Sequence, residues 1–162
     1  MDQYCFIKML YLADREAYAE WGESITGDCP VSMQFGPVLS NVYNLTRGDS
    51  PAYRAEWSPF ISDAQPETHR VILVRDPGTD DLSRAEMRVL NEVFEKFKGY
   101  GFSQMLKFSH ALEEYDESVG QSSRPIRVEA ILKAMGKTDE EISDTTRSHR
   151  EDQALNLIFG VA

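Results

Sequence analysis

The chain has 162 residues, of which 41% are hydrophobic and 27% are charged, values ordinary for one globular domain that buries its own core. Its net charge of −10 argues against nonspecific binding to DNA or RNA, because their phosphates would repel it. No apolar run is long enough to span a membrane, and the first residues lack a signal-peptide pattern. Cys5 and Cys29 have no metal-binding spacing. Because two thiols in a chain of this size fit a reducing compartment, the expected compartment is the cytoplasm.

The first predicted element is a helix over residues 3–21. Helical spacing places a stripe of core residues on one side of it: Ile7, Leu10, Tyr11, Asp14, Tyr18 and Trp21. Asp14 is the one carboxylate in this otherwise apolar or aromatic stripe. If it is buried, it needs hydrogen-bond donors or a cation. Gly22 is suited to end the helix.

A turn, a strand and a second helix are predicted next. Gly27 in Thr-Gly-Asp suits a positive φ. Apolar residues alternate with polar ones over residues 31–35, which predicts a half-buried strand. The Gly36-Pro37 pair is then expected to stop the strand and start a helix, in which Pro37 takes the first position.

Two further strands are predicted over residues 57–61 and 70–74, the second being the better buried because its β-type run is the more continuous. From residue 82 onward the chain is expected to be helical. Capping boxes begin at Ser83 and Thr138, and Ser103 is suited to cap the helix between them. The predicted fold class is therefore α+β: a mainly helical single domain with a small antiparallel sheet of about three strands.

Motifs for catalysis and metal binding are missing from the sequence. The three histidines, His69, His110 and His149, have no metal-ligand spacing among themselves or with the cysteines. Ser109 and His110 are adjacent, so they point to different sides of a helix, and no nucleophile elbow exists. We therefore predict no catalytic residues, no metal and no cofactor, and interpret the chain as a non-enzyme.

Two residues and the last apolar segment leave alternatives open. Asp14 either belongs to a polar site near the Gly27 and Gly36 turns, or accepts hydrogen bonds from backbone N–H groups at a nearby turn or helix start; the second is favoured. His110 is interpreted as a satisfied core-edge histidine rather than a pH switch. The apolar residues 155–162 either dock on their own domain, bind a partner or form an end that a protease recognises.

Three sequence blocks carry a family resemblance: KMLYLADRE at residues 8–16, ITGD at 25–28 and FGPVLSNVY at 35–43. With them, the chain resembles the Panacea domain, the family that includes the SocA-like antitoxins. Looser agreement continues to residue 115. We therefore expect a Panacea-like core domain over residues 1–115, and a C-terminal helical extension over residues 116–162 packed on it or projecting from it. The motif positions, acting as fold determinants or as interface residues, are Lys8, Asp14, Arg15, Gly27, Asp28, Gly36, Pro37, Tyr43 and His110.

The resemblance implies a bacterial or phage antitoxin of a toxin–antitoxin system, which neutralises its cognate toxin by direct protein–protein binding. An alternative is a proteolytic adaptor that delivers the toxin to a Clp-type protease, and a further alternative is an uncharacterised enzyme. The expected partners are the toxin and, for an adaptor, the protease, with no membrane and no direct nucleic-acid binding. The acidic surface suits a basic toxin face. We expect residues 49–56 and the segment after residue 113 to determine toxin choice.

Overall fold

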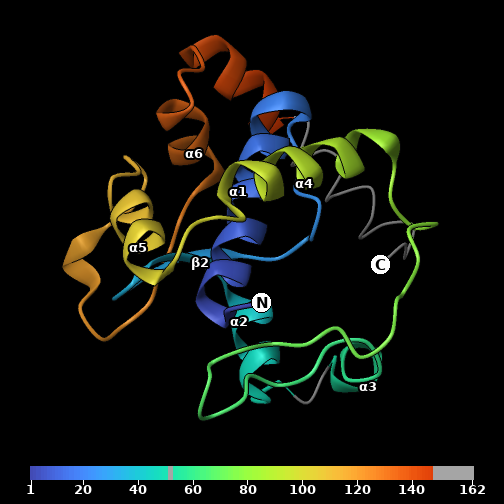
Figure 1. Ribbon diagram of the computed structural model, residues 1–162. Coiled ribbons are helices and arrows are strands. Elements are labelled where there is room, and N and C mark those ends of the chain that lie inside the picture. The colour runs from blue at the N-terminus through green and yellow to red at the C-terminus, as the bar shows by residue number, and fades with distance from the viewer. Residues whose placement is uncertain (51–52, 148–162) are drawn as a thin grey trace.

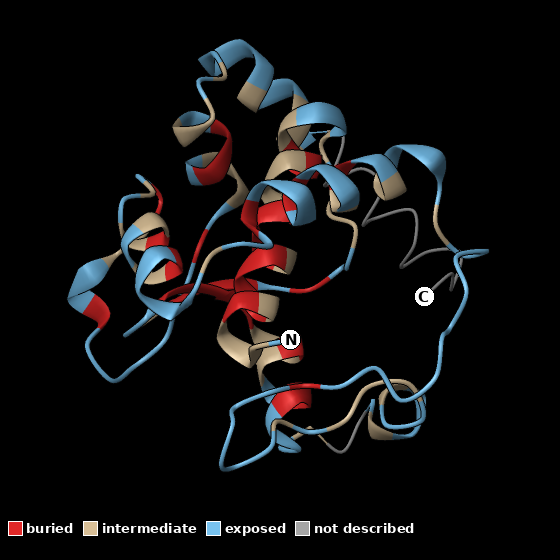
Figure 2. Ribbon diagram, in the orientation of Figure 1, coloured by how far each residue is buried: buried red, intermediate tan, exposed pale blue. Residues whose placement is uncertain are grey.

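The computed structural model describes residues 1–50 and 53–147. Helix α1 (Gln3–Trp21) runs through the middle, with α2, α4, α5, α6 and the sheet packed around it (Figure 1). It has the predicted bounds, and Gly22 ends it with a φ of 87°. Buried residues lie on several sides of α1 (Figure 2), so it is the central element of the core rather than a surface helix.

The sheet has three antiparallel strands in the order β2–β1–β3. Strands β1 (Pro30–Met33) and β2 (Gly36–Leu39) form a hairpin. Strand β3 (Arg124–Pro125) pairs with the other edge of β1. The predicted α+β class, mainly helical with a small antiparallel sheet, is confirmed. None of the described helices is both long and apolar enough to cross a membrane.

The helix predicted from Pro37 is wrong at its start. Gly36 has a φ of 91° and Pro37 is buried within β2, so helix α2 (Ser40–Arg47) begins three residues later. Pro37 is tolerated because β2 is an edge strand. No further strand pairs with its outer side, so the missing N–H of proline costs no hydrogen bond there. The predicted strand also ends early: Phe35, expected to face the core, lies in the hairpin turn and is 53% exposed.

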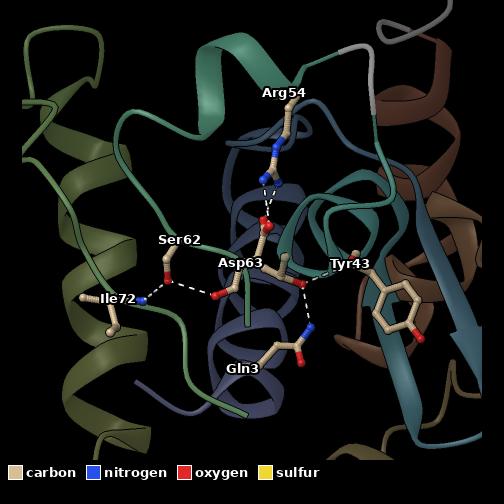
Figure 3. A network of polar contacts seen from close by, with 7 residues as sticks. Gln3, Tyr43, Arg54, Ser62, Asp63 and Ile72 are labelled. Carbon is tan, nitrogen blue, oxygen red and sulfur yellow. Dashed lines mark hydrogen bonds and ion pairs between the residues drawn. The ribbon is translucent and has the colours of Figure 1, made fainter. Parts of the chain in front are cut away.

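The strand predicted over residues 57–61 is wrong. The short helix α3 (Arg54–Trp57) and a turn occupy this part of the chain. Pro59 lacks the N–H that a ladder uses. Across the turn, Arg54 Nη2 donates to Asp63 Oδ2 at 2.7 Å (Figure 3), an exposed ion pair that closes the loop on itself.

The strand predicted over residues 70–74 is also wrong. Within the described chain its backbone forms isolated bridges, to Asp2 and to Ile61, and no continuous ladder. Val71 is buried, but residues 72–74 are between 46% and 62% exposed. An apolar β-type run does not form a strand without a sheet edge to pair with and a core to cover.

The chain continues with the helices α4 (Arg84–Phe97), α5 (Phe102–His110) and α6 (Val128–Ala134). The short 3₁₀ helix η1 (Glu117–Val119) separates α5 from β3, and residues 139–147 are helical. Both predicted capping boxes are confirmed, with Ser83 N–H donating to Glu86 at 2.7 Å and Thr138 N–H to Glu141 at 2.8 Å. Gly101, not Ser103, is the N-cap of α5.

The chain after residue 115 contributes to the same core. Besides the pairing of β3 with β1, Ile126, Ile131 and Leu132 are buried in the main hydrophobic cluster. The division of the chain after residue 115 stays a prediction. The apolar residues 155–162 lie outside the described residues.

Candidate functional site

Asp14 is buried in α1, and its carboxylate binds the chain that follows this helix. Its Oδ1 accepts the N–H groups of Ile25 at 2.9 Å and Thr26 at 3.0 Å, and its Oδ2 accepts the Thr26 hydroxyl. Burial raises the pKa of the carboxyl, and these hydrogen bonds oppose that rise. The turn that Asp14 holds contains Gly27, whose φ is 65°. These contacts are the backbone arrangement that the sequence favoured for Asp14.

Asp28 caps the N-terminus of α2, although it precedes this helix by several residues in the sequence. Its Oδ1 accepts the N–H of Asn41 at 3.0 Å and the hydroxyl of Ser40 at 3.2 Å, and its Oδ2 accepts the N–H of Val42 at 2.9 Å. N–H groups in a first helical turn have no partner within the helix, and a carboxylate there also interacts favourably with the helix dipole. Leu39, the N-cap residue itself, makes no side-chain capping bond. Asp28 therefore supplies the cap.

Arg15 joins α1 to the segment after α5. Its Nε donates to Oε1 of Glu114 at 2.6 Å, and the Tyr11 hydroxyl donates to the same oxygen at 2.8 Å. The Glu114 side chain is fully buried and that of Arg15 is 12% exposed. Burial, followed by the charge of Glu114, raises the pKa of Tyr11 well above its ordinary value, so the hydroxyl remains a donor. A buried carboxylate with matched donors fixes the two segments together.

Lys8 is, with Asp14, one of two buried charged residues of α1. Only 1% of the residue is exposed, and its Nζ donates to the Pro37 carbonyl at 2.5 Å. The ammonium lies 5.1 Å from the centroid of the Tyr4 ring. Lys8 takes part in no ion pair within residues 1–50 and 53–147. Burial lowers the pKa of Lys8 to about 7, because the charged form loses the water around it.

Gly36 allows the β1–β2 turn to approach both α1 and α5. A Cβ atom at this position would lie 2.7 Å from Ser109 Oγ and 3.1 Å from Lys8 Nζ. The φ of 91° is also a conformation that side chains disfavour. The Tyr4 hydroxyl donates to the Phe35 carbonyl at 2.8 Å and thereby ties the turn to α1.

A cavity of about 360 Å³ lies beside this contact between α1 and the turn. The buried residues of its wall are Ile7, Lys8, Gly36 and Val38. Exposed residues at its edge are Gln34, Phe35, Gln121 and Ser122. The volume suits a small ligand or one or two side chains of a partner.

Tyr43 on α2 lines the same cavity. The Arg47 guanidinium lies 5.3 Å from the centroid of its ring and donates to its hydroxyl at 2.8 Å. The Tyr43 carbonyl accepts the Thr46 hydroxyl at 2.9 Å, and Thr46 in turn accepts from Gln3 at 2.9 Å (Figure 3). Tyr43 thus belongs both to the α1–α2 contact and to the cavity wall.

His110 ends α5 and stacks on Tyr115, with ring centroids 4.7 Å apart. The Tyr115 hydroxyl donates to the carbonyl of Met33 at 3.2 Å. His110 is half-buried at the edge of the core, as predicted. It is not satisfied there, because its buried Nε2 has no hydrogen-bond partner in the described chain.

The motif residues are gathered in two places and dispersed elsewhere. Asp14, Gly27 and Asp28 form one group, and Lys8, Gly36, Pro37 and Tyr43 form another around the cavity, whereas Arg15 and His110 make separate contacts. A role for any of them in a partner interface stays a prediction.

Sequence reasoning missed two residues of this site. Glu114 stands in an acidic stretch, and nothing in its spacing points to Arg15. Tyr4 lies one helical turn before Lys8, a spacing at which side chains meet, and this signal was available.

Comparison with known proteins gives one match. A sequence model of the family described as antitoxin SocA-like, Panacea domain, matches residues 6–115. The matched range includes every motif residue named above. No curated protein and no solved structure matches the chain. Within the described residues, no group of three or more His, Cys, Asp or Glu side chains is placed to hold a metal ion.

Proposed function

Because the chain belongs to the SocA-like antitoxin family of Panacea domains, we propose that it neutralises a cognate toxin by direct protein–protein binding. The match over residues 6–115 is the observation that carries this proposal. Membership of an antitoxin family also favours a non-enzymatic role. The toxin and the antitoxin would meet in the cytoplasm.

The packing of the motif residues supports a binding role. Asp14, Asp28 and Arg15 direct their polar atoms to groups of their own domain, and so stabilise a scaffold. Outside this scaffold, Phe35 and Phe102 are 53% and 47% exposed, with ring centroids 6.5 Å apart. Aromatic side chains are enriched in the centres of protein interfaces. The net charge of −10 also favours association with a basic protein surface.

Co-expression with the product of the adjacent gene tests the proposal. We expect that this product arrests growth alone, that the chain restores growth, and that the two proteins elute together in size-exclusion chromatography. A neighbour whose toxicity the chain never relieves would contradict the proposal.

The route of neutralisation needs a separate measurement. Direct binding predicts that the chain restores growth equally well in a host without Clp proteases and leaves the half-life of the toxin unchanged. Rescue that disappears in that host, together with a half-life that the chain shortens only when the protease is present, would establish the adaptor alternative instead.

A further inference from the structure

The ammonium of Lys8 has unused hydrogen-bonding capacity. A lysine ammonium has three N–H donors, and within the described chain Lys8 uses one of them, on the Pro37 carbonyl at 2.5 Å. By contrast, the buried carboxylate of Asp14 accepts from two backbone N–H groups and one hydroxyl. A buried charge with one neutral partner is expensive, so a counter-ion would be bound favourably there.

The cavity lies next to this ammonium. Tyr4 and Gly36 both line it, and Lys8 Nζ lies 5.1 Å from the Tyr4 ring centroid and 3.1 Å from the position of a Cβ on Gly36. The rest of the buried wall is apolar, from Ile7 and Val38. A ligand that fits this cavity therefore has an apolar body and one anionic or acceptor group.

We propose that this cavity binds a carboxylate carried on an apolar or aromatic segment of the partner protein. Lys8 is the one basic residue among the described residues that line the cavity. One ammonium neutralises one carboxylate, whereas a phosphate with two charges would keep one of them uncompensated. Such a pair forms in a site shielded from water, where a charge-assisted hydrogen bond is strong. The pKa of Lys8, lowered by burial to about 7, is consistent with a charge that lacks a counter-ion.

The charge of the chain indicates the source of the carboxylate. A net charge of −10 repels a free anion at long range. A carboxylate on a protein is held near the cavity by other contacts. The exposed ring of Phe35 lines the cavity, and the exposed ring of Phe102 lies next to that of Phe35, so both can supply such contacts. The identification of this protein as the toxin rests on the proposed function.

A pair of small probes tests the site without the toxin. In NMR spectra of the ¹⁵N-labelled chain, 3-phenylpropionate should shift the amide signals of Gly36 and Val38 saturably, and 3-phenylpropanamide should bind at least roughly tenfold more weakly. The acid should lose its advantage in Lys8→Met and keep it in Lys107→Met, which removes an exposed lysine outside the cavity. Equal binding of acid and amide, or no saturable shift with either, would overturn the proposal.

Affinity for the product of the adjacent gene tests the source. Lys8→Met and Gln121→Trp, which blocks the cavity from its exposed edge, should each weaken binding by roughly tenfold or more. Lys107→Met and Phe94→Ala, an exposed phenylalanine on α4, should leave it unchanged. Because Gln121 is exposed, its variant remains informative if Lys8→Met does not fold.

The outcomes separate the site from the function. Wild-type affinity in both Lys8→Met and Gln121→Trp would overturn the role of the cavity in partner binding. If the wild-type chain does not bind the product of the adjacent gene, the proposed function fails, and so does the partner as the source of the carboxylate. The preference for 3-phenylpropionate over 3-phenylpropanamide still decides whether the cavity binds carboxylates.

Discussion

Two regions beside α1 treat buried charge differently. At the Asp14 and Asp28 turns, each carboxylate accepts several hydrogen bonds from backbone N–H and hydroxyl groups. At the β1–β2 turn, the buried ammonium of Lys8 has one carbonyl acceptor and an adjoining cavity of about 360 Å³. Both regions contain motif residues, so the motif alone does not distinguish them.

The difference separates two roles for a buried polar residue. Where hydrogen-bonding capacity is filled within the domain, the residue fixes the positions of turns and helices, and its removal leaves orphaned groups. Where capacity is left over beside a cavity, the domain has room for a group from another molecule. On this basis Asp14 and Asp28 are architectural, and Lys8 is the stronger candidate for an interaction with a ligand.

The largest expected effect on stability is at Glu114, another buried carboxylate whose donors come from the same domain. Glu114→Ala should lower the free energy of unfolding by about 3 kcal/mol, because it leaves the Arg15 guanidinium and the Tyr11 hydroxyl buried without their acceptor. Urea unfolding followed by circular dichroism measures it. The neighbouring Glu113→Ala changes an exposed carboxylate and should stay within about 0.5 kcal/mol of wild type. Similar effects of the two substitutions would contradict the buried contact of Glu114 with Arg15 and Tyr11.

Lys8 should have a smaller effect, which appears in the pH dependence of the free energy of unfolding. Its pKa is about 7 in the folded chain against an ordinary value of 10.5, so above pH 7 the unfolded chain binds the proton and the folded chain releases it. The free energy of unfolding should therefore rise with pH. The contribution of Lys8 between pH 7 and pH 9 is about 2 kcal/mol.

Lys8→Met should lack this rise, whereas Lys107→Met should keep it. The range stops at pH 9 because burial raises the pKa of Cys5 from 9.0 to about 11, which lowers stability at higher pH. Denaturant unfolding at a series of pH values gives the comparison. Identical pH slopes for wild type and Lys8→Met would contradict an uncompensated ammonium.

The smallest expected effect is the loss of the α2 cap. Asp28→Ala should lower the free energy of unfolding by about 1–2 kcal/mol, a range typical for removal of a helix N-cap. Hydrogen exchange should accelerate most at the amides of Asn41 and Val42, which donate to Asp28. The matched control, Asp49→Ala, breaks an exposed ion pair with Arg47 and should change stability by less than about 0.5 kcal/mol. Unchanged exchange at Asn41 and Val42 would contradict the capping role.

The parts of the fold that depend on neighbouring residues were predictable from the sequence. Helix α1, the glycine that ends it and the two capping boxes follow from helical spacing and from contacts over three or four residues. Which residues of α4 face the core depends on the elements packed around it: Val89, Val93 and Phe97 are buried, whereas Phe94 is 41% exposed.

The parts that depend on distant segments were not predictable. Strand β3 exists because Arg124 and Pro125 meet the free edge of β1, and Glu114 meets Arg15 across 99 positions of sequence. Residues 70–74 have strong β propensity but meet no sheet edge. Within the site, the turn held by Asp14 followed from the chemistry of a buried carboxylate. The cavity beside Lys8, by contrast, arises only when α1, the hairpin, α2 and residues 121–122 come together.

Hydrogen exchange of the chain with the product of the adjacent gene bound tests the distinction between the two regions most directly. We expect new protection in the peptide covering residues 33–38 and at residues 121–122, around the cavity beside Lys8. The turn at residues 24–28, which Asp14 already holds, should exchange at the same rate with and without the partner. New protection confined to the turn at residues 24–28, with none around the cavity, would contradict the distinction.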